Sequence, residues 1–267
     1  MTDPKSAIEA AEQTQTAEEF IATIAPMTAT SGQLTILRDL GQITDRDSIL
    51  EIWCGGGDLT AQLAEIGGRV VGSDYSQKLV DAARTRFPHL EFEVSEADDL
   101  NFPDAVFDVV VSNFIAHHYS DPAKNFAEAK RVLKVGGRHL VTIPVQSKRV
   151  GFNLVLTAAR EFVDLPERPV KGGPLLDAEH PDEIIDLMRT AGFDEVYGDQ
   201  RSSYTVLVSI DALLNYTWKK LGLDGASQEA QNRIRVTSIE RAQPYRTADG
   251  SYHFPDQILA VRGDKAR

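Results

Sequence analysis

The chain has 267 residues, 42% of them hydrophobic, with a formal net charge of −12 and an isoelectric point near 5.0. This length predicts one large domain with additions. The acidity argues against a general nucleic-acid binder, which needs a basic face for phosphates, and it weakly favours a neutral or cationic substrate.

The sequence also limits the metal chemistry and the compartment that we expect. Cys54 is the single cysteine, so neither a disulfide framework nor a multi-cysteine metal site is predicted. No His-x-Glu-x-x-His pattern or comparable ligand spacing occurs, and we predict no metal. The polar, acidic stretch at residues 1–20 and the lack of a membrane-length apolar run predict a cytoplasmic enzyme without a membrane span.

Two helices are predicted before the first strand. Residues 7–24 are alanine-rich, and residues 31–40 carry leucines at helical spacing before Gly41. We treat residues 1–44 as an N-terminal helical cap. This cap is expected either to cover the ligand site or to pack on the sheet.

A strand, a glycine turn, a helix and a second strand are predicted over residues 48–74. An apolar run carrying Glu51 precedes three glycines at 55–57, a helical pattern follows at 58–66, and a second apolar run ends at Asp74. A parallel unit of this kind brings both strand ends to one edge of a sheet, where ligands bind. Glycines let the backbone approach a ligand closely, and an acid ending the second strand suits two ribose hydroxyls. The stretch therefore predicts a nucleotide-type cofactor site.

The alternation of strands and helices continues after this unit. Ser76 caps a helix, and strands are predicted at residues 90–94, 106–113 and 138–144. A helix between the last two is expected to be capped by Asp121 and to end at Gly136-Gly137. The run at 106–113 is nearly all apolar, which is typical of the middle of a parallel sheet.

The C-terminal part is predicted to hold the substrate-facing elements. Its predicted elements are helices at 149–163 and 181–191 with a loop at 165–174 between them, a sixth strand that starts at 193–197, and a last strand at 254–262. Two further helices within residues 209–243 form an insertion. The predicted fold is α/β, a doubly wound, mostly parallel seven-stranded sheet, with residues 45–267 as one domain and the insertion between strands six and seven.

This ordered set of motifs resembles the class I S-adenosylmethionine-dependent methyltransferases, and in particular the small-molecule group that includes the ubiquinone and menaquinone methyltransferases. The resemblance covers roughly residues 48–144, with further matches at 107–112 and 131–138. A dinucleotide site would need a third glycine where Thr60 stands. Glu51 before the turn would disfavour a pyrophosphate and suits the cationic amino group of S-adenosylmethionine.

The resemblance implies that the N-terminal helices cover the cofactor or the substrate mouth and that the insertion at residues 209–243 is a lid over the acceptor pocket. It also implies cofactor contacts at the ends of neighbouring strands. Glu96 would accept from the adenine amino group and the Ala97 amide would face a ring nitrogen, with Asp98 as the alternative contact if the register is shifted by two. The residues that it assigns to cofactor binding are Glu51, Trp53, Gly55, Gly57, Asp74, Tyr75, Glu96, Ala97 and Asn113.

Trp53 departs from the family pattern, which has glycine at this place on the floor of the cofactor pocket. The indole is expected either to pack within the sheet or to alter the pocket. An altered pocket would fit a methyltransferase-fold protein that has lost methyl transfer, such as a rearrangement catalyst or a binding or regulatory subunit. A nicotinamide-dependent oxidoreductase is a third hypothesis, disfavoured by Glu51 and Thr60.

His117 and His118 are the catalytic candidates, because they follow the fourth strand on the ligand-binding edge. A histidine of near-neutral pKa can serve as a base for a hydroxyl acceptor, although one of two adjacent residues normally points away. Tyr216 and Trp218 on the insertion are expected either to line an apolar acceptor pocket or to pack in the core. The predicted function is methyl transfer from S-adenosylmethionine to a small-molecule acceptor, without nucleic acid; a homodimer is left open.

Overall fold

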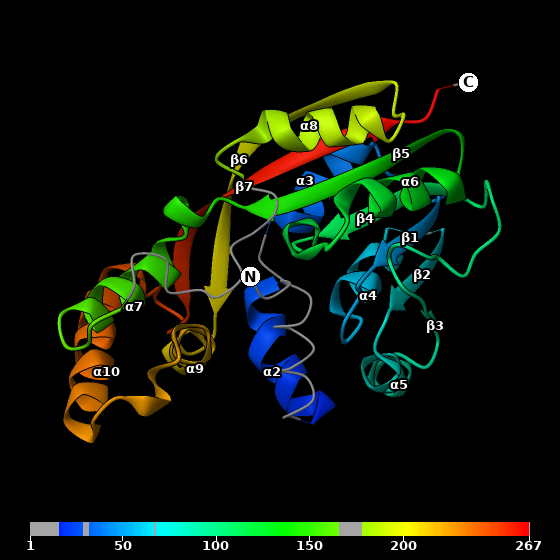
Figure 1. The fold of residues 1–267 in the computed structure, drawn as a ribbon. Helices are drawn as coiled ribbons and strands as arrows, with labels where there is room; N and C mark the ends of the chain where they lie inside the picture. The colour runs from blue at the N-terminus through cyan, green and yellow to red at the C-terminus, as the bar shows by residue number, and fades with distance from the viewer. Residues whose placement is uncertain (1–15, 29–31, 67, 166–177, 267) are drawn as a thin grey trace.

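A single seven-stranded sheet forms the centre of the molecule (Figure 1). The computed structural model describes residues 16–28, 32–66, 68–165 and 178–266, so most of the loop predicted at 165–174 lies outside the described residues. The strands are β1 (Ser48–Ile52), β2 (Arg69–Asp74), β3 (Glu91–Val94), β4 (Phe107–Asn113), β5 (Leu133–Pro144), β6 (Glu195–Leu207) and β7 (Tyr252–Asp264).

The strand order is β3-β2-β1-β4-β5-β7-β6. Each neighbouring pair is parallel except those of β7, which runs antiparallel to both β5 and β6. The predicted doubly wound, mostly parallel seven-stranded sheet is confirmed. The order reverses between β1 and β4, and ligands bind at such a reversal, beyond the carboxyl ends of the strands.

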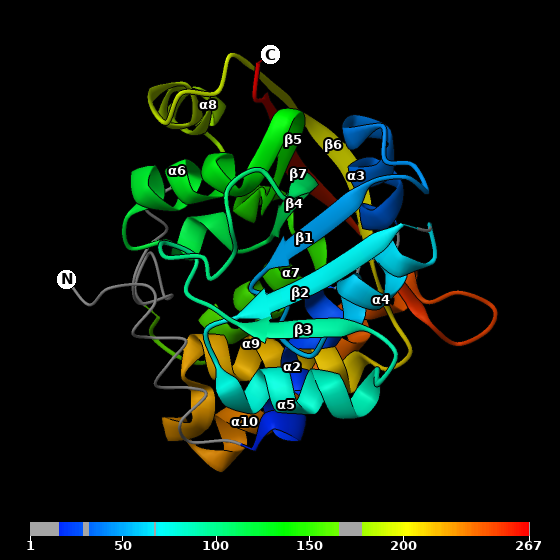
Figure 2. The same cartoon turned by 90° about the vertical axis from the view of Figure 1, so that its right-hand side faces the viewer.

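Helices cover both faces of the sheet. They are α2 (Ala17–Thr28), α3 (Gln33–Gly41), α4 (Asp58–Ala64), α5 (Gln77–Arg86), α6 (Pro122–Val132), α7 (Val150–Arg160), α8 (Pro181–Thr190), α9 (Ile210–Leu221) and α10 (Gln228–Ala242). Figure 2 shows β1, β2 and β3 side by side, with α5 along β3. Within the described ranges, each helix is either too short or too polar to span a bilayer.

Successive residues of each strand belong to two separate parts of the hydrophobic core, one on each face of the sheet. Ile49 of β1 packs with α3 and α4 on one face, whereas Leu50 and Ile52 pack with α6 and α8 on the other. Side chains of a strand alternate between faces, and both faces of this sheet are buried, so the strands are continuously apolar.

A further core lies where β6 and β7 extend beyond the other strands. α7, α9 and α10 gather there around Leu207 and Phe254 (Figure 1). α9 and α10 are the helical insertion predicted between strands six and seven, and the fold confirms its place. Ser209 caps α9, accepting from the Asp211 amide.

The boundary between α6 and β5 was predicted wrongly. We expected Gly136-Gly137 to end the helix before the fifth strand, but α6 ends at Val132 and β5 begins at Leu133. Gly136 has a φ of +80°, and the register of β4 against β5 shifts between Phe107 and Val109. The two glycines therefore form a bulge inside the strand, a use of glycine that sequence alone does not distinguish from a helix end.

Candidate cofactor and acceptor site

The turn after β1 has the backbone that its glycines predict. Gly55 and Gly57 have φ values of +53° and +82°, a region that favours glycine. A Cβ at Gly55 would meet nothing within 4 Å, so this residue is open to the close approach of a ligand. A Cβ at Gly57 would lie 2.8 Å from the ring of Phe92, so this glycine is also required by packing.

Asp74 joins the end of β2 to this turn. One carboxylate oxygen accepts from the amide of Gly55 at 2.9 Å, and the other accepts from the amide of Ser76 at 3.0 Å. Each oxygen of a carboxylate can accept more than one hydrogen bond. The turn backbone and the acid predicted to bind ribose are therefore brought together at the edge of β1 and β2.

Glu51 lies beneath the turn rather than on its open side. Its carboxyl group is buried and accepts a hydrogen bond from the Thr60 hydroxyl. Burial raises the pKa of Glu51 to about 8; the Thr60 hydrogen bond opposes this shift, and the charges of Asp58 and Asp74 add to it. The group is consequently neutral at pH 7 until a nearby cation favours its charged form.

Trp53 has a left-handed backbone, with a φ of +57°, at the place where the family has glycine. Its ring centroid lies 5.1 Å from that of Tyr75 and 6.2 Å from that of Tyr119. The indole N–H is buried and has no hydrogen-bond partner among the described residues. The indole packs against the core on the α6 side of the sheet, and a left-handed backbone costs such a residue about 1–2 kcal/mol.

The indole also reaches the loop predicted to hold adenine. Trp53, Glu96, Ala97 and Asp98 line one small hollow of about 10 Å³, roughly the room of one water molecule. The structure thus brings Trp53 and the adenine loop together, in both of the registers considered. That the glycine turn and Asp74 hold the methionine and ribose parts of S-adenosylmethionine, and that Glu96 and Ala97 hold its adenine, stays a prediction.

Asn113 ends β4 next to this region. Its side-chain oxygen accepts from the Thr142 hydroxyl of β5 at 2.7 Å, and the residue is buried. Asn113 is therefore held in one orientation by the neighbouring strand. Whether it contacts the cofactor stays a prediction.

The two histidines predicted for catalysis lie in a short 3-10 helix, Ala116–His118. The side chain of His117 lies outside the described parts of the structure. Burial, and secondarily the charge of Lys220, lowers the pKa of His118 to about 3. His118 is thus neutral throughout the physiological range, and a weaker base than its sequence position suggests.

The two N-terminal helices have different places. α3 packs on the sheet through Leu37 and Leu40. α2 lies over the glycine turn, where a Cβ on Gly56 would come within 2.9 Å of Ile21, and it also packs against α9. The packing of α3 on the sheet agrees with one of the two alternatives for this region; that α2 covers the ligand site stays a prediction.

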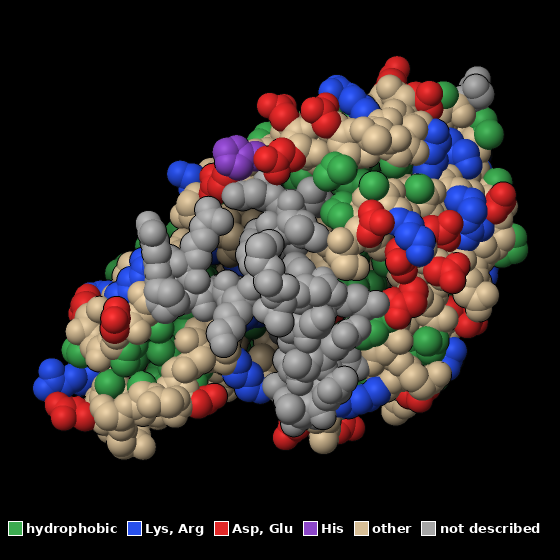
Figure 3. Space-filling view, viewed as in Figure 1, with side chains coloured by type: hydrophobic (Ala, Val, Ile, Leu, Met, Phe, Trp, Pro, Cys, Tyr) green, Lys and Arg blue, Asp and Glu red, His purple; other side chains and the backbone are tan. Residues whose placement is uncertain are grey.

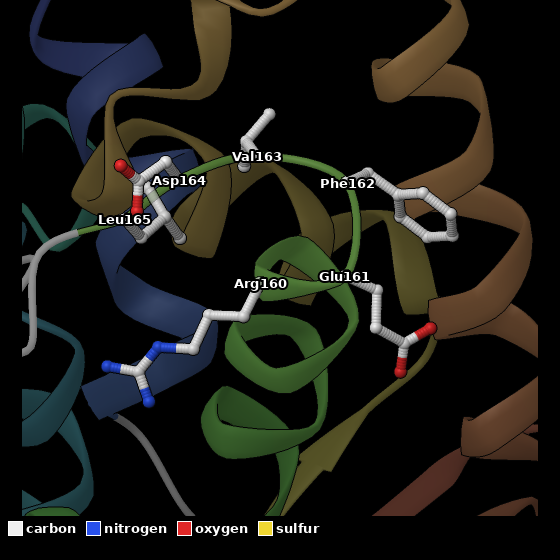
Figure 4. Close-up of a pocket in the computed structure, with 6 residues that line it drawn as sticks. All are labelled: Arg160, Glu161, Phe162, Val163, Asp164 and Leu165. Atoms are coloured by element: carbon white, nitrogen blue, oxygen red, sulfur yellow. The ribbon is translucent and has the colours of Figure 1, made fainter.

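A larger open hollow, of about 530 Å³, lies at the C-terminal end of α7 and is lined by the consecutive residues 160–165. Figure 4 shows the charged groups of Arg160 and Glu161 pointing apart rather than toward a common centre. Binding pockets need convergent polar groups, so we do not assign a site there.

Two residues of this region were not singled out by sequence analysis. Tyr119 contacts the Trp53 ring, and Arg149, just after β5, is buried beside Tyr216. Arg149 follows Lys148 in a polar stretch that suggests solvent. Its place after a strand end on the ligand edge was the one available signal.

Comparison with known proteins agrees with this geometry. Residues 50–141 match the family model described as a methyltransferase domain. The chain is 35% identical over 163 residues to the demethylmenaquinone methyltransferase of Clavibacter sepedonicus, covering 56% of this chain and 66% of that protein. It is 29% identical over 153 residues to the ubiquinone biosynthesis O-methyltransferase of Cereibacter sphaeroides, covering 55% and 60%. The chain therefore spans less than two thirds of the length of either relative.

The fold has solved counterparts. Phosphoethanolamine N-methyltransferase 2 of Haemonchus contortus, in complex with S-adenosyl-L-methionine, superposes with a TM-score of 0.62 at 20% identity, covering all of this chain and 61% of the other. At this identity the likeness concerns the fold alone. With its matching methyltransferase domain at residues 50–141, its sheet order and its glycine turn, the chain is similar in sequence and in fold to S-adenosylmethionine-dependent methyltransferases.

Proposed function

We propose that this protein transfers a methyl group from S-adenosylmethionine to a small-molecule acceptor. The observation that carries the proposal is the hydrogen bond from the Gly55 amide to Asp74, which sets an acid beside an open glycine backbone at the strand-end edge. The names of the relatives support the same activity.

The residues of this chain would bind and orient rather than supply reactive groups. When bound, S-adenosylmethionine provides a methyl group already activated by its sulfonium. The turn at Gly55 would hold the methionine part, Asp74 the ribose hydroxyls, and Glu96 with Ala97 the adenine. Fixing two reactants in line can lower a barrier by about 7–11 kcal/mol, so such positioning accounts for most of the catalysis required.

Isothermal titration tests the proposed cofactor. S-adenosylmethionine and S-adenosylhomocysteine should bind, and NADH should not. Asp74→Asn should weaken binding, whereas Asp182→Asn, an exposed acid on α8, is the matched control and should not. Preference for NADH would instead indicate the nicotinamide-dependent oxidoreductase.

A mass-spectrometric screen tests the transfer itself. The protein and S-adenosylmethionine are incubated with a panel of phenols, amines and carboxylic acids, and products that gain one methyl group are sought. Tight cofactor binding without methylated product or cofactor turnover would contradict the proposal and favour the protein that has lost methyl transfer.

We further propose that His118 accepts a hydrogen bond from the acceptor rather than titrating as a general base. Its low pKa supports this role. The pH profile of kcat should therefore show no histidine inflection between pH 5 and 8. An inflection near pH 6.5 that disappears in His118→Ala would restore His118 as the base; His117 is tested in the same way.

The remaining proposals concern the surroundings of the site. We propose that residues 1–44 cap the cofactor and residues 209–243 cover the acceptor, which the contact of α2 with Gly56 and α9 supports. A cytoplasmic location and the lack of a nucleic-acid partner are supported by the acidic charge and by the mixture of acidic and basic side chains on the face in Figure 3. Size-exclusion chromatography decides between a monomer and a homodimer.

A further inference from the structure

A buried cation lies a few residues beyond the carboxyl end of β5. Arg149 follows the carboxyl end of β5 and is only 7% exposed. Tyr216 and Lys220 approach it from α9, the first helix of the insertion, which packs against α7 (Figure 1). The group therefore lies between the sheet edge and the elements proposed to cover the acceptor.

The described residues around Arg149 leave most of its N–H donors without a hydrogen bond. One guanidinium nitrogen donates to the Tyr216 hydroxyl over a long 3.4 Å. The guanidinium carbon lies 5.7 Å from the ring centre of Phe152 and 5.6 Å from that of Tyr216. A guanidinium has five N–H donors. Aromatic rings can stabilise its charge, but they leave those donors without hydrogen bonds.

No acid within the described residues forms an ion pair with Arg149. The charge of Asp256 reaches it, but this carboxylate already accepts from the Thr205 hydroxyl and from the amide of Val150. A buried charge is normally paired, and an arginine in a dry, aromatic setting suits a planar anion that it can bind with two hydrogen bonds.

A second cation extends the positive region. The Lys220 ammonium lies 5.9 Å from the ring centre of Tyr216, on the same ring that Arg149 contacts. Two neighbouring groups respond to this field. Burial alone raises the pKa of Tyr216, but the charges of Arg149 and Lys220 outweigh it and lower the pKa. Burial and then Lys220 lower the pKa of His118. The lowered pKa of Tyr216 favours its anionic form, and the lowered pKa of His118 disfavours its cationic form. Both shifts have the direction expected where the electrostatic potential is positive.

We propose that Arg149 and Lys220 form an anion-binding subsite, so that the methyl acceptor carries a carboxylate or phosphate group beside an apolar or aromatic part. Arg149 binds the anion with its free donors, Lys220 adds charge, and the rings of Phe152 and Tyr216 contact the apolar part. This inference rests on the proposed function, because the bound molecule is a methyl acceptor only if the protein transfers methyl groups. It revises the expectation of a neutral or cationic substrate that the net charge of −12 suggested.

Matched small ligands test the subsite. Benzoate and phenyl phosphate are compared with benzamide, which has a similar shape and no charge, by isothermal titration in the presence of S-adenosylhomocysteine. At least one anion should bind at least tenfold tighter than benzamide, and the better one identifies the anionic group. Equal binding of the three ligands, or no binding of either anion, would overturn the proposal.

Variants locate the binding. Arg149→Gln should weaken the preferred anion at least tenfold and Lys220→Gln by a smaller factor, while Lys219→Gln, the exposed neighbour on α9, should not change it. Lys220 is only partly buried, so its variant keeps the test usable if Arg149→Gln does not fold. An unchanged anion affinity in folded Arg149→Gln, or in Lys220→Gln if that is the variant that folds, would refute the assignment.

The cofactor titration separates this inference from the proposed function. S-adenosylmethionine affinity should be unchanged in Lys220→Gln, because Lys220 is not among the residues proposed to hold the cofactor. If the anions bind at Arg149 while the cofactor does not bind at all, methyl transfer fails and the anion subsite stands. If the cofactor binds and the anions do not, the anion subsite is refuted and the proposed methyl transfer stands.

Discussion

Replacement of Trp53 by glycine tests whether the indole is a structural support or an obstacle at the adenine end of the site. Complete truncation of a core tryptophan costs about 3–5 kcal/mol, and the half-buried Trp53 should lose about 2–3 kcal/mol. Two gains oppose this loss. Glycine adopts the φ of +57° without the left-handed penalty of about 1–2 kcal/mol, and a buried N–H without a partner, worth about 1–3 kcal/mol, is removed.

These contributions nearly cancel, so Trp53→Gly should change the free energy of unfolding by less than about 2 kcal/mol. Trp53→Ala removes the same indole but keeps a Cβ at a positive φ. The glycine variant should therefore be more stable than the alanine variant by about 1 kcal/mol. Urea denaturation followed by circular dichroism measures both differences.

The same substitution should affect cofactor binding, because the indole lies against Tyr75 and the Glu96–Asp98 loop. We expect S-adenosylmethionine to bind Trp53→Gly at least tenfold tighter, or about 1.4 kcal/mol. Trp218 is the one other tryptophan, so in a Trp218→Phe background cofactor binding should change the fluorescence of Trp53 directly.

Two results would refute this reasoning. A loss of more than about 4 kcal/mol in Trp53→Gly would show that the indole is a main support of the core. Unchanged or weaker cofactor binding, with normal stability, would show that the ring does not compete with adenine. It would then be a wall of the site.

Three further predictions follow from buried carboxyl groups. Asp74→Ala should weaken S-adenosylmethionine binding by about 1–3 kcal/mol through lost charged hydrogen bonds; an equal affinity by titration would show that the ribose acid is misassigned. The pKa of Glu51 is raised to about 8 by burial, so its stabilising protonated form is complete below about pH 4.5 and lost as pH rises through 8. The free energy of unfolding of Glu51→Gln, relative to that of the unmodified protein, should therefore rise by about 1.4 kcal/mol per pH unit over that interval. An equal difference between the two proteins at pH 5.5 and 7.5 would contradict this. Asp47 forms a nearly buried pair with Arg138 at 2.9 Å; burial alone would raise the pKa of Asp47, but the Arg138 hydrogen bonds lower it overall, so its contribution is present above about pH 4 and lost below. Asp47→Ala should cost about 3 kcal/mol at pH 7 and less in acid, and a loss under 1 kcal/mol would place this pair among ordinary surface ion pairs.

The sequence by itself determined the fold and the cofactor class. Strands with both faces buried are continuously apolar, and each is followed by a turn and an amphipathic helix, so the parallel sheet could be predicted from the pattern of residues. The pairing of Gly55 with Asp74 was also predictable, because parallel strands bring their carboxyl ends to one edge whatever their separation along the chain.

Only the tertiary structure decided what the side chains at that edge do. Glu51 and Trp53 were placed correctly at the end of β1, but burial keeps the carboxyl group neutral and turns the indole toward Tyr75 and the adenine loop. Arg149 and Lys220 are 71 residues apart in their numbering, and their common contact with the ring of Tyr216 depends on how the insertion folds back on β5. Local spacing predicts which residues share an edge, whereas desolvation and long-range packing set their charge and their neighbours.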